Sequence, residues 1–175
     1  MVRFAPFAAD CQTVGSGESE AMSKVSAKKI PLGSWQDPQG DVVLVYSLFE
    51  CSIFFGCWDE AGVPADYVCL LSFTAAVATR SFPREYIPYE IEPAEHKSYV
   101  LEVVDSPWLH DQQRERKRLQ ETVYRHNPGR PWDARHFVVT GHDIYHEILA
   151  ASYKESRVYK ADITDPRLLA LIDAA

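Results

Sequence analysis

The sequence contains none of the short motifs that identify common enzyme classes. It has no GxSxG nucleophile elbow, no P-loop, no GxGxxG dinucleotide fingerprint and no HExxH zinc motif. None of its four cysteines forms a CxxC pair. Catalytic groups can also be assembled in space from distant segments, so these absences count against an enzyme without excluding one.

Long apolar runs are also missing. The most apolar stretch, residues 42–58, is interrupted by polar residues and is shorter than the ~20 residues that a membrane-spanning helix needs. The first residues lack the apolar core of a secretory signal. Cys51, Cys57 and Cys69 lie within apolar runs, as small core residues do. These features predict a cytoplasmic protein that does not associate with membranes.

Basic side chains are too few to balance the acidic ones outside the N-terminal segment. The chain carries a formal net charge of −7, and residues 1–29 hold four basic and three acidic side chains, so the remainder carries −8. An acidic body repels nucleic-acid backbones and anionic lipid, which argues against nucleic-acid binding. The charge favours a basic protein or a metal ion as partner.

The amino-acid composition is typical of a single folded domain. Of the 175 residues, 46% are hydrophobic and 12% aromatic, enough to bury a core without disulfides. Residues 11–29 are small, polar and aperiodic, which predicts a flexible N-terminal tail over residues 1–29. Residues 30–175 are then a single domain.

Apolar and β-branched residues predict about seven strands in this domain. They lie near residues 42–46, 52–58, 67–73, 77–82, 99–104, 137–139 and 144–150. Three prolines between residues 83 and 93 exclude a regular helix there and allow at most an edge strand.

Two helices are predicted from their start signals. Ser106 followed by Pro107 has the pattern of an N-cap and first helical residue, and the charged helix should run to about Tyr124. Asp165-Pro166 announces a short C-terminal helix that should dock on the sheet. The expected fold class is α+β, with a mainly antiparallel twisted sheet or half-closed sandwich, one long charged helix and a short C-terminal one.

The densest group of potential ligands is the segment HFVVTGHDIYHE, residues 136–147. If this segment were helical, His142 and His146 would share a face, with Asp143 and Glu147 beside them, and could bind a divalent metal. A hairpin is favoured instead, because Val138 and Val139 disfavour a helix and Gly141-His142 is typical of a turn.

The predicted hairpin pairs Val139 with Ile144, which places His136 opposite Glu147 as a cross-strand polar pair. His142 and His146 would then stand roughly 13 Å apart along the strand, too far to share one metal. A resident cofactor is therefore not expected, and a divalent metal is expected only if the segment is helical.

A second group of candidates is basic and aromatic. Between residues 107 and 135 seven basic side chains face four acidic ones, so a phosphate or an acidic partner could bind there. The simpler interpretation is a solvated helix with ion pairs such as Glu115 with Arg118. Exposed tryptophans could add a recognition surface. The candidate patch comprises Trp108, Arg114, Arg118, Arg125, Trp132 and His136.

These observations predict a binding or accessory protein, for example an antitoxin-like or immunity-like inhibitor of a basic protein. One alternative is a metal-dependent hydrolase that uses His142 and His146 as ligands, with Asp143 or Glu147 as a further ligand or general base. Another is a carrier of a small ligand on an aromatic sheet face. An exposed sheet edge would also allow two copies to pair as a homodimer.

Overall fold

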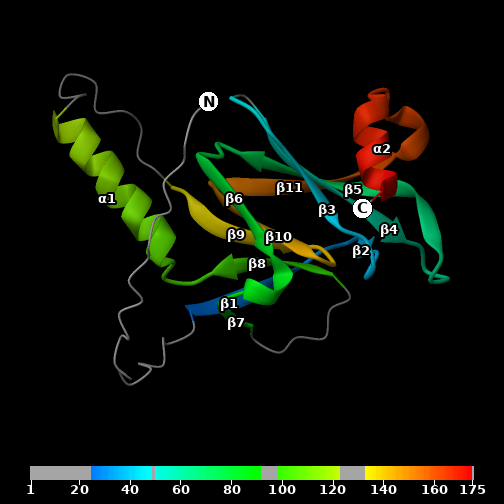
Figure 1. Ribbon diagram of the computed structural model, residues 1–175, viewed down its shortest axis with the longest axis horizontal. Coiled ribbons are helices and arrows are strands. Elements are labelled where there is room, and N and C mark those ends of the chain that lie inside the picture. Colours follow the sequence, from blue (N-terminus) through cyan, green and yellow to red (C-terminus); the bar gives the residue numbers. More distant parts are fainter. Residues whose placement is uncertain (1–24, 49, 92–97, 123–132, 175) are drawn as a thin grey trace, which may run out of the picture.

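The computed structural model describes residues 25–48, 50–91, 98–122 and 133–174 (Figure 1). Over these ranges the chain is mostly strands, arranged in two curled sheets that pack against each other. Sheet A has the order β6-β10-β9-β8-β1-β7, and sheet B has the order β11-β5-β4-β2, with β3 also paired to β4.

The bounds of the elements are as follows. Sheet A contains β1 (Val25–Pro31), β6 (Ala78–Pro83), β7 (Tyr89–Ile91), β8 (Tyr99–Val103), β9 (Arg135–Thr140) and β10 (Ile144–Ala150). Sheet B contains β2 (Trp35–Gln36), β3 (Val42–Tyr46), β4 (Cys51–Trp58), β5 (Pro64–Thr74) and β11 (Ser152–Tyr159). The helical elements are η1 (Arg84–Tyr86), α1 (Pro107–Thr122), η2 (Lys160–Asp162) and α2 (Pro166–Ala174).

The predicted α+β class is wrong. The described residues form eleven strands rather than about seven, and helix is limited to one charged helix of 16 residues and short pieces. The seven predicted strands are all present, but β1, β2, β7 and β11 were missed. These four have little of the apolar alternation that marks a strand in a sequence, and they owe their conformation to pairing with neighbours.

The predicted tail of residues 1–29 ends too late. Strand β1 begins at Val25 and pairs antiparallel with β8, where Ala27 lies opposite Val103 and is fully buried. The charged side chains of Lys28 and Lys29 favoured the prediction of a solvated tail for this segment. Lys29 is accommodated because its ammonium group lies 4.6 Å from the centre of the Tyr99 ring. The tail before Val25 lies outside the described residues.

The main core lies between the two sheets. Sheet B contributes Ile53, Phe55 and Leu71, and sheet A contributes Phe137 and Ile148, all of which are at most 1% exposed. These residues alternate along their strands with residues of the opposite face, as the pleat requires. Burial also raises the pKa of the core thiols, to about 11 for Cys51 and Cys57, so these cysteines stay protonated.

Helix α2 covers the outer face of sheet B, as predicted. Asp165 accepts a hydrogen bond from the backbone N–H of Arg167 at 2.8 Å, which caps the helix start. Ile172 then packs against Phe54 and Val68. Figure 1 shows α2 and α1 at opposite ends of the molecule.

Sheet A curls strongly. Its two edge strands, β6 and β7, are separated by four strands in the sheet order, yet only residues 84–88 connect them. Five residues span at most about 18 Å, so the edges can be joined only because the sheet bends round on itself. Strand β7 pairs parallel with β1 as an edge strand, which fits the prediction for the proline-rich segment.

The predicted hairpin of residues 136–150 is confirmed, but its register is wrong. Val139 pairs with His146 rather than Ile144, and His136 pairs with Leu149 rather than Glu147. The turn lies one residue later than predicted: the Gly141 N–H donates to the Ile144 carbonyl at 2.7 Å, so His142 and Asp143 form the turn. The Asp41 carboxylate holds it there by accepting hydrogen bonds from the backbone N–H groups of residues 143 and 144, at 2.8 and 3.3 Å.

None of the helices that the structure describes is both long and apolar enough to cross a membrane.

Candidate functional site

Charged and aromatic side chains from five elements meet on the face of sheet A that points away from sheet B. We call this group the Glu147 cluster. It consists of Arg80 on β6, Tyr89 on β7, Ser106 and Trp108 at the start of α1, His136 on β9 and Glu147 on β10. The two-residue change in hairpin register keeps every side chain on its predicted face, which is why His136 and Glu147 still meet.

Glu147 is fully buried and is the centre of the cluster. Its carboxylate accepts hydrogen bonds from the Tyr89 hydroxyl and from Nε of Arg80. Nε2 of His136 lies 3.6 Å from Oε2 of Glu147. Burial alone would raise the pKa of the Glu147 carboxyl, but the interactions with His136, Arg80 and Tyr89 outweigh it and lower the pKa. The carboxyl is therefore ionised at neutral pH.

Tyr89 serves this carboxylate as a hydrogen-bond donor. Its side chain reaches from β7 across the curl of sheet A to β10. Burial, together with the nearby negative charge of Glu147, raises the pKa of the Tyr89 hydroxyl, so the hydroxyl keeps its proton.

His136 links the carboxylate to the start of α1. The Ser106 hydroxyl lies 2.7 Å from Nδ1 of His136, and its oxygen also accepts the backbone N–H of Leu109 at 3.1 Å. With that N–H as its donor, the hydroxyl is free to donate its own proton to Nδ1. Nε2 then carries the ring hydrogen and points it toward Glu147. One serine thus caps α1 and orients a buried histidine.

Arg80 reaches solvent, with 37% of its side chain exposed. Its guanidinium carbon lies 4.1 Å from the centre of the Trp108 ring and 5.4 Å from that of Phe82. Nε of the guanidinium donates a hydrogen bond to Glu147, and the Tyr89 hydroxyl also interacts with the Arg80 side chain. The planar group is therefore held on its buried side by Glu147 and Tyr89, while its outer edge reaches solvent.

Ser106, His136 and Glu147 are the residue types of a hydrolytic triad, but their arrangement differs. In such triads the serine approaches Nε2 and the carboxylate Nδ1, whereas here the serine is at Nδ1. Ser106 is also only 2% exposed and its oxygen caps the helix. The arrangement is suited to holding charge and fixing α1 rather than to nucleophilic attack.

Replacing Ser106 with alanine should lower the free energy of unfolding by about 2 kcal/mol. About 1 kcal/mol is the loss of the helix cap, and a similar amount follows from leaving Nδ1 of buried His136 without its donor. Asp165→Ala is the matched control because it removes an exposed cap alone. Urea denaturation of both variants would contradict this role for Ser106 if their losses were equal.

The predicted metal ligands do not converge. Their helical arrangement required a helix over the segment, and the segment is a hairpin. Nδ1 of His142 lies 2.9 Å from the Asp143 carboxylate on the exposed turn. His146 faces the opposite side of the sheet from Glu147, where its ring bonds the Ser81 hydroxyl at 2.7 Å and the Val42 carbonyl at 3.1 Å. Within the described ranges, no three His, Cys, Asp or Glu side chains are grouped to hold a metal ion.

The predicted binding patch is only partly assembled. Trp108 and His136 do meet, with ring centres 5.1 Å apart in a T-shaped arrangement. Arg114 and Arg118 lie farther along α1, exposed and paired with Asp111 and Glu115 one helical turn before them. Two further candidates, Arg125 and Trp132, lie outside the described residues.

Sequence reasoning missed Arg80 and Tyr89 as site residues and treated Ser106 only as a helix cap. A signal was present for one pair. Arg80 and Glu147 are the single charged residues of β6 and β10, and they prove to be directly paired across these strands. Each of these strands otherwise consists mainly of apolar or small residues. If both charged side chains are buried, they are expected to pair with each other. The part played by Tyr89 depends on the curl of sheet A and left no sequence signal.

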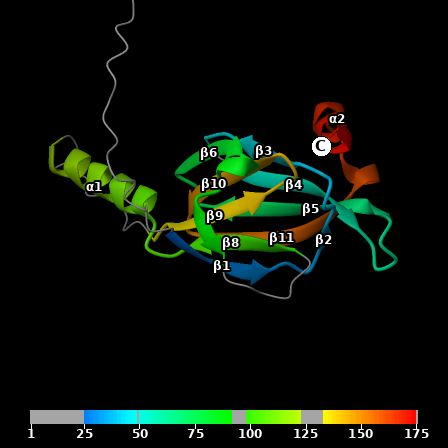
Figure 2. The same cartoon turned by 60° about the horizontal axis from the view of Figure 1, so that its bottom comes forward.

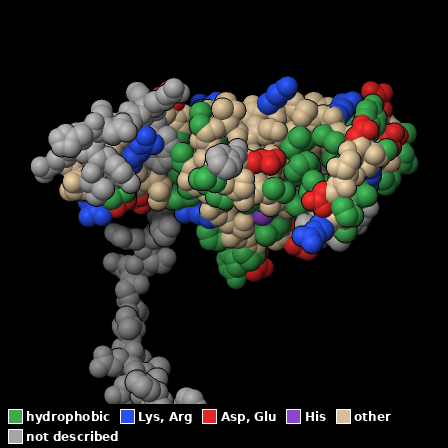
Figure 3. Space-filling model, turned by 90° about the horizontal axis from the view of Figure 1, so that it is seen from above, with side chains coloured by type: hydrophobic (Ala, Val, Ile, Leu, Met, Phe, Trp, Pro, Cys, Tyr) green, Lys and Arg blue, Asp and Glu red, His purple; other side chains and the backbone are tan. Residues whose placement is uncertain are grey.

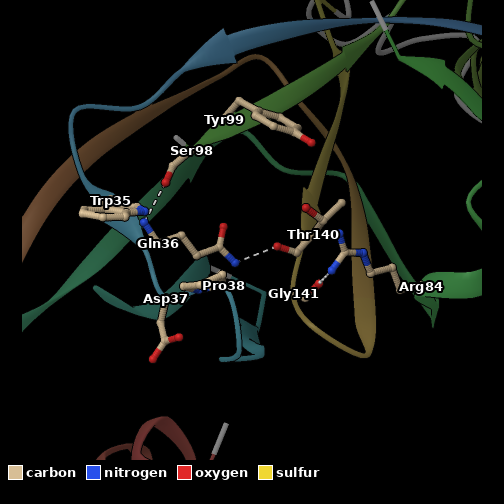
Figure 4. A pocket seen from close by; sticks show the side chains of 9 residues that line it. All are labelled: Trp35, Gln36, Asp37, Pro38, Arg84, Ser98, Tyr99, Thr140 and Gly141. Atoms are coloured by element: carbon tan, nitrogen blue, oxygen red, sulfur yellow. Dashed lines mark hydrogen bonds between the residues drawn. The ribbon is translucent and has the colours of Figure 1, made fainter. Parts of the chain in front are cut away.

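A separate small cavity of about 160 Å³ lies where β2 meets the turn of the β9–β10 hairpin (Figure 4). The Gln36 side-chain amide donates to the Thr140 carbonyl at 2.7 Å, and the Gln36 backbone N–H donates to the Ser98 hydroxyl at 2.6 Å. Arg84 donates to the Gly141 carbonyl at 3.2 Å. These bonds tie β2, the segment before β8 and the hairpin turn together, so the groups that make them serve the structure of the cavity wall.

Comparison with protein-family models, with curated proteins and with solved structures gave no match.

Proposed function

We propose that this protein acts by binding another protein, and that the contact surface is the end of the molecule formed by α1 and the exposed side of the Glu147 cluster. The observation that carries this proposal is that α1, a helix of 16 residues, has no buried residue. Figures 1 and 2 show α1 extending away from the two sheets.

A helix in this position receives little stability from the body of the protein. It is anchored at its start, where Ser106 caps it and Trp108 packs on His136. Isolated helices of about 12–15 residues are marginal in water, and most helices in proteins are stabilised by packing one face. The exposed side chains of α1, such as those of Gln113 and Lys117, are therefore accessible to a partner.

The charge of this end favours an acidic partner surface. Helix α1 carries four basic side chains (Arg114, Arg116, Lys117 and Arg118) against three acidic ones, and its first turn has no acidic residue. The two described ion pairs on the helix are highly exposed. Exposed pairs can exchange partners at little desolvation cost, so an acidic surface could take over these arginines.

The total charge supports a different partner, a basic protein that this chain would inhibit in the manner of an antitoxin or immunity protein. Figure 3 shows acidic side chains gathered toward the end that carries α2, opposite α1. That prediction therefore concerns the other end of the molecule, and it remains a prediction. The hydrolase and ligand-carrier alternatives gain no supporting contact among the described residues.

The proposal is tested by placing a photo-crosslinking residue at Gln113 on α1 and, as a control, at Lys154 on β11; both positions are exposed. We expect a discrete protein adduct in the native cell from position 113 and none from position 154. The cross-linked protein is then produced recombinantly and its affinity for the purified chain is measured.

Reversing the charge of α1 with Arg114→Glu and Arg118→Glu together should weaken that affinity by about tenfold or more. The matched control, Lys154→Glu with Arg167→Glu, makes the same change of net charge far from α1 and should leave the affinity nearly unchanged. Equal weakening by both double variants would show that net charge matters and α1 does not.

A further inference from the structure

The geometry points to a specific role for Arg80, and we propose that it is the receptor for a carboxylate group of the protein partner. This inference deepens the proposed function and rests on it. It concerns the described residues around the start of α1, where Arg80, Trp108 and the positively polarised end of the helix lie together.

The guanidinium of Arg80 is already held in one orientation. Glu147 binds Nε, and the rings of Trp108 and Phe82 lie against the guanidinium plane at 4.1 and 5.4 Å. An arginine fixed in this way has lost its rotamer freedom before any ligand arrives. Binding then costs less entropy than it would at a mobile surface arginine.

On its buried side the cluster is more than an isolated ion pair between Arg80 and Glu147. The Glu147 carboxylate also accepts the Tyr89 hydroxyl and faces Nε2 of His136, so its charge is shared among three neighbours. The guanidinium of Arg80 is engaged by Glu147 through Nε and by Tyr89 beside it, while the side chain is still 37% exposed, so its outer edge reaches solvent. Two parallel N–H groups at the edge of a guanidinium match the two oxygens of a carboxylate.

The aromatic surroundings favour a carboxylate carried by a protein side chain or chain terminus over a free inorganic anion. Trp108 and Phe82 flank the guanidinium with apolar surface, against which the methylene groups of an aspartate or glutamate can pack. The basic residues of α1 extend the positive surface beyond this point, so an acidic segment rather than a single charge fits the site.

The test uses a blocked tetraglutamate peptide as the acidic probe and a blocked tetraglutamine peptide as its uncharged counterpart. Titration of the ¹⁵N-labelled full chain at low salt is followed by NMR at Nε–H of Arg80 and at the indole N–H of Trp108. We expect both signals to shift with tetraglutamate and neither with tetraglutamine.

Arg80→Lys is the diagnostic variant because it keeps the positive charge beside Glu147 but removes the planar pair of donors. It should weaken tetraglutamate binding by about tenfold. Arg84→Lys, the same replacement at the next arginine in the chain, should leave binding unchanged. The shift at Nε–H of Arg80 in the unmodified protein gives an answer even if the lysine variant folds poorly.

The outcomes separate this inference from the proposed function. If tetraglutamate binding resists Arg80→Lys but is lost with Arg114→Glu and Arg118→Glu, the Arg80 receptor is wrong while α1 remains the contact. If tetraglutamate does not bind, or tetraglutamine binds equally well, the carboxylate receptor is wrong, and the cross-linking experiment alone decides the role of α1.

Discussion

Replacing Arg80 with alanine should lower the free energy of unfolding by about 3 kcal/mol, because it leaves the Glu147 carboxylate buried without its cationic partner. The figure is at the lower end of the range for broken buried pairs, since Tyr89 still donates to the carboxylate. Arg80 is one of the groups that lower the pKa of this buried carboxyl, so its removal raises that pKa relative to the unmodified protein. The loss should therefore shrink at mildly acid pH, where the variant can take up a proton. Urea denaturation at neutral and mildly acid pH measures both effects.

The double variant Arg80→Ala with Glu147→Gln supplies the control. It removes both charges and keeps an amide that can still accept from Tyr89, so it should recover more than half of the stability lost in the single variant. A double variant that is as unstable as Arg80→Ala would show that the cost arises from lost packing on Trp108 and Phe82 rather than from an unpaired charge.

Lowering the pH below about 6.5 should destabilise the protein through His146. Burial lowers the pKa of this imidazole and outweighs the opposing effects of the Val42 carbonyl and the Asp41 carboxylate. The unfolded chain takes up the proton near pH 6.5, whereas the folded protein does so only at lower pH. The free energy of unfolding is therefore unaffected above pH 6.5 and falls below it, by up to about 1.4 kcal/mol per pH unit.

The physical cause is the position of His146 between the sheets. Its ring accepts from the Ser81 hydroxyl and donates to the Val42 carbonyl, which joins β10 to β6 and to β3 of the opposite sheet. Protonation of both ring nitrogens would place a positive charge in this buried contact between the sheets. It would also break the hydrogen bond that the Ser81 hydroxyl donates to Nδ1.

The measurement is urea denaturation at intervals between pH 5 and 7.5, with two glutamine variants. His146→Gln should flatten the pH dependence, although it costs stability at every pH. His142→Gln should leave the dependence intact because this residue is exposed on the hairpin turn. Parallel pH profiles for the unmodified protein and His146→Gln would contradict the assignment.

Local signals in the sequence were sufficient for a large part of the fold. Apolar and β-branched runs located seven strands, and Ser-Pro and Asp-Pro pairs located the starts of both helices. The 136–150 segment was recognised as a hairpin because paired β-branched residues and a Gly-containing turn disfavour a helix. Each of these features depends on residues that are close in the chain.

The register of the β9–β10 hairpin could not be predicted from residues that are close in the chain. The sequence allows a two-residue turn at Gly141-His142 or one residue later. The later position is the one observed, and there the Asp41 carboxylate, about a hundred positions earlier in the chain, accepts hydrogen bonds from the N–H groups of residues 143 and 144. Gly141 is required for this approach, because a Cβ there would lie 2.5 Å from the Asp41 carboxylate oxygen and 2.9 Å from the Val42 backbone nitrogen. A contact between residues so far apart in the chain produces no periodic pattern from which it could be predicted.

The sequence by itself thus determined which segments are strands with an apolar face, where the helices begin and that a charged helix is present. The tertiary structure alone decided the fold class, because β1, β2, β7 and β11 become strands through pairing rather than through their own residues. It also decided the site. Arg80, His136 and Glu147 meet because β6, β10 and β9 are neighbours in sheet A, and the curl of the sheet brings Tyr89 to them from the far edge strand β7.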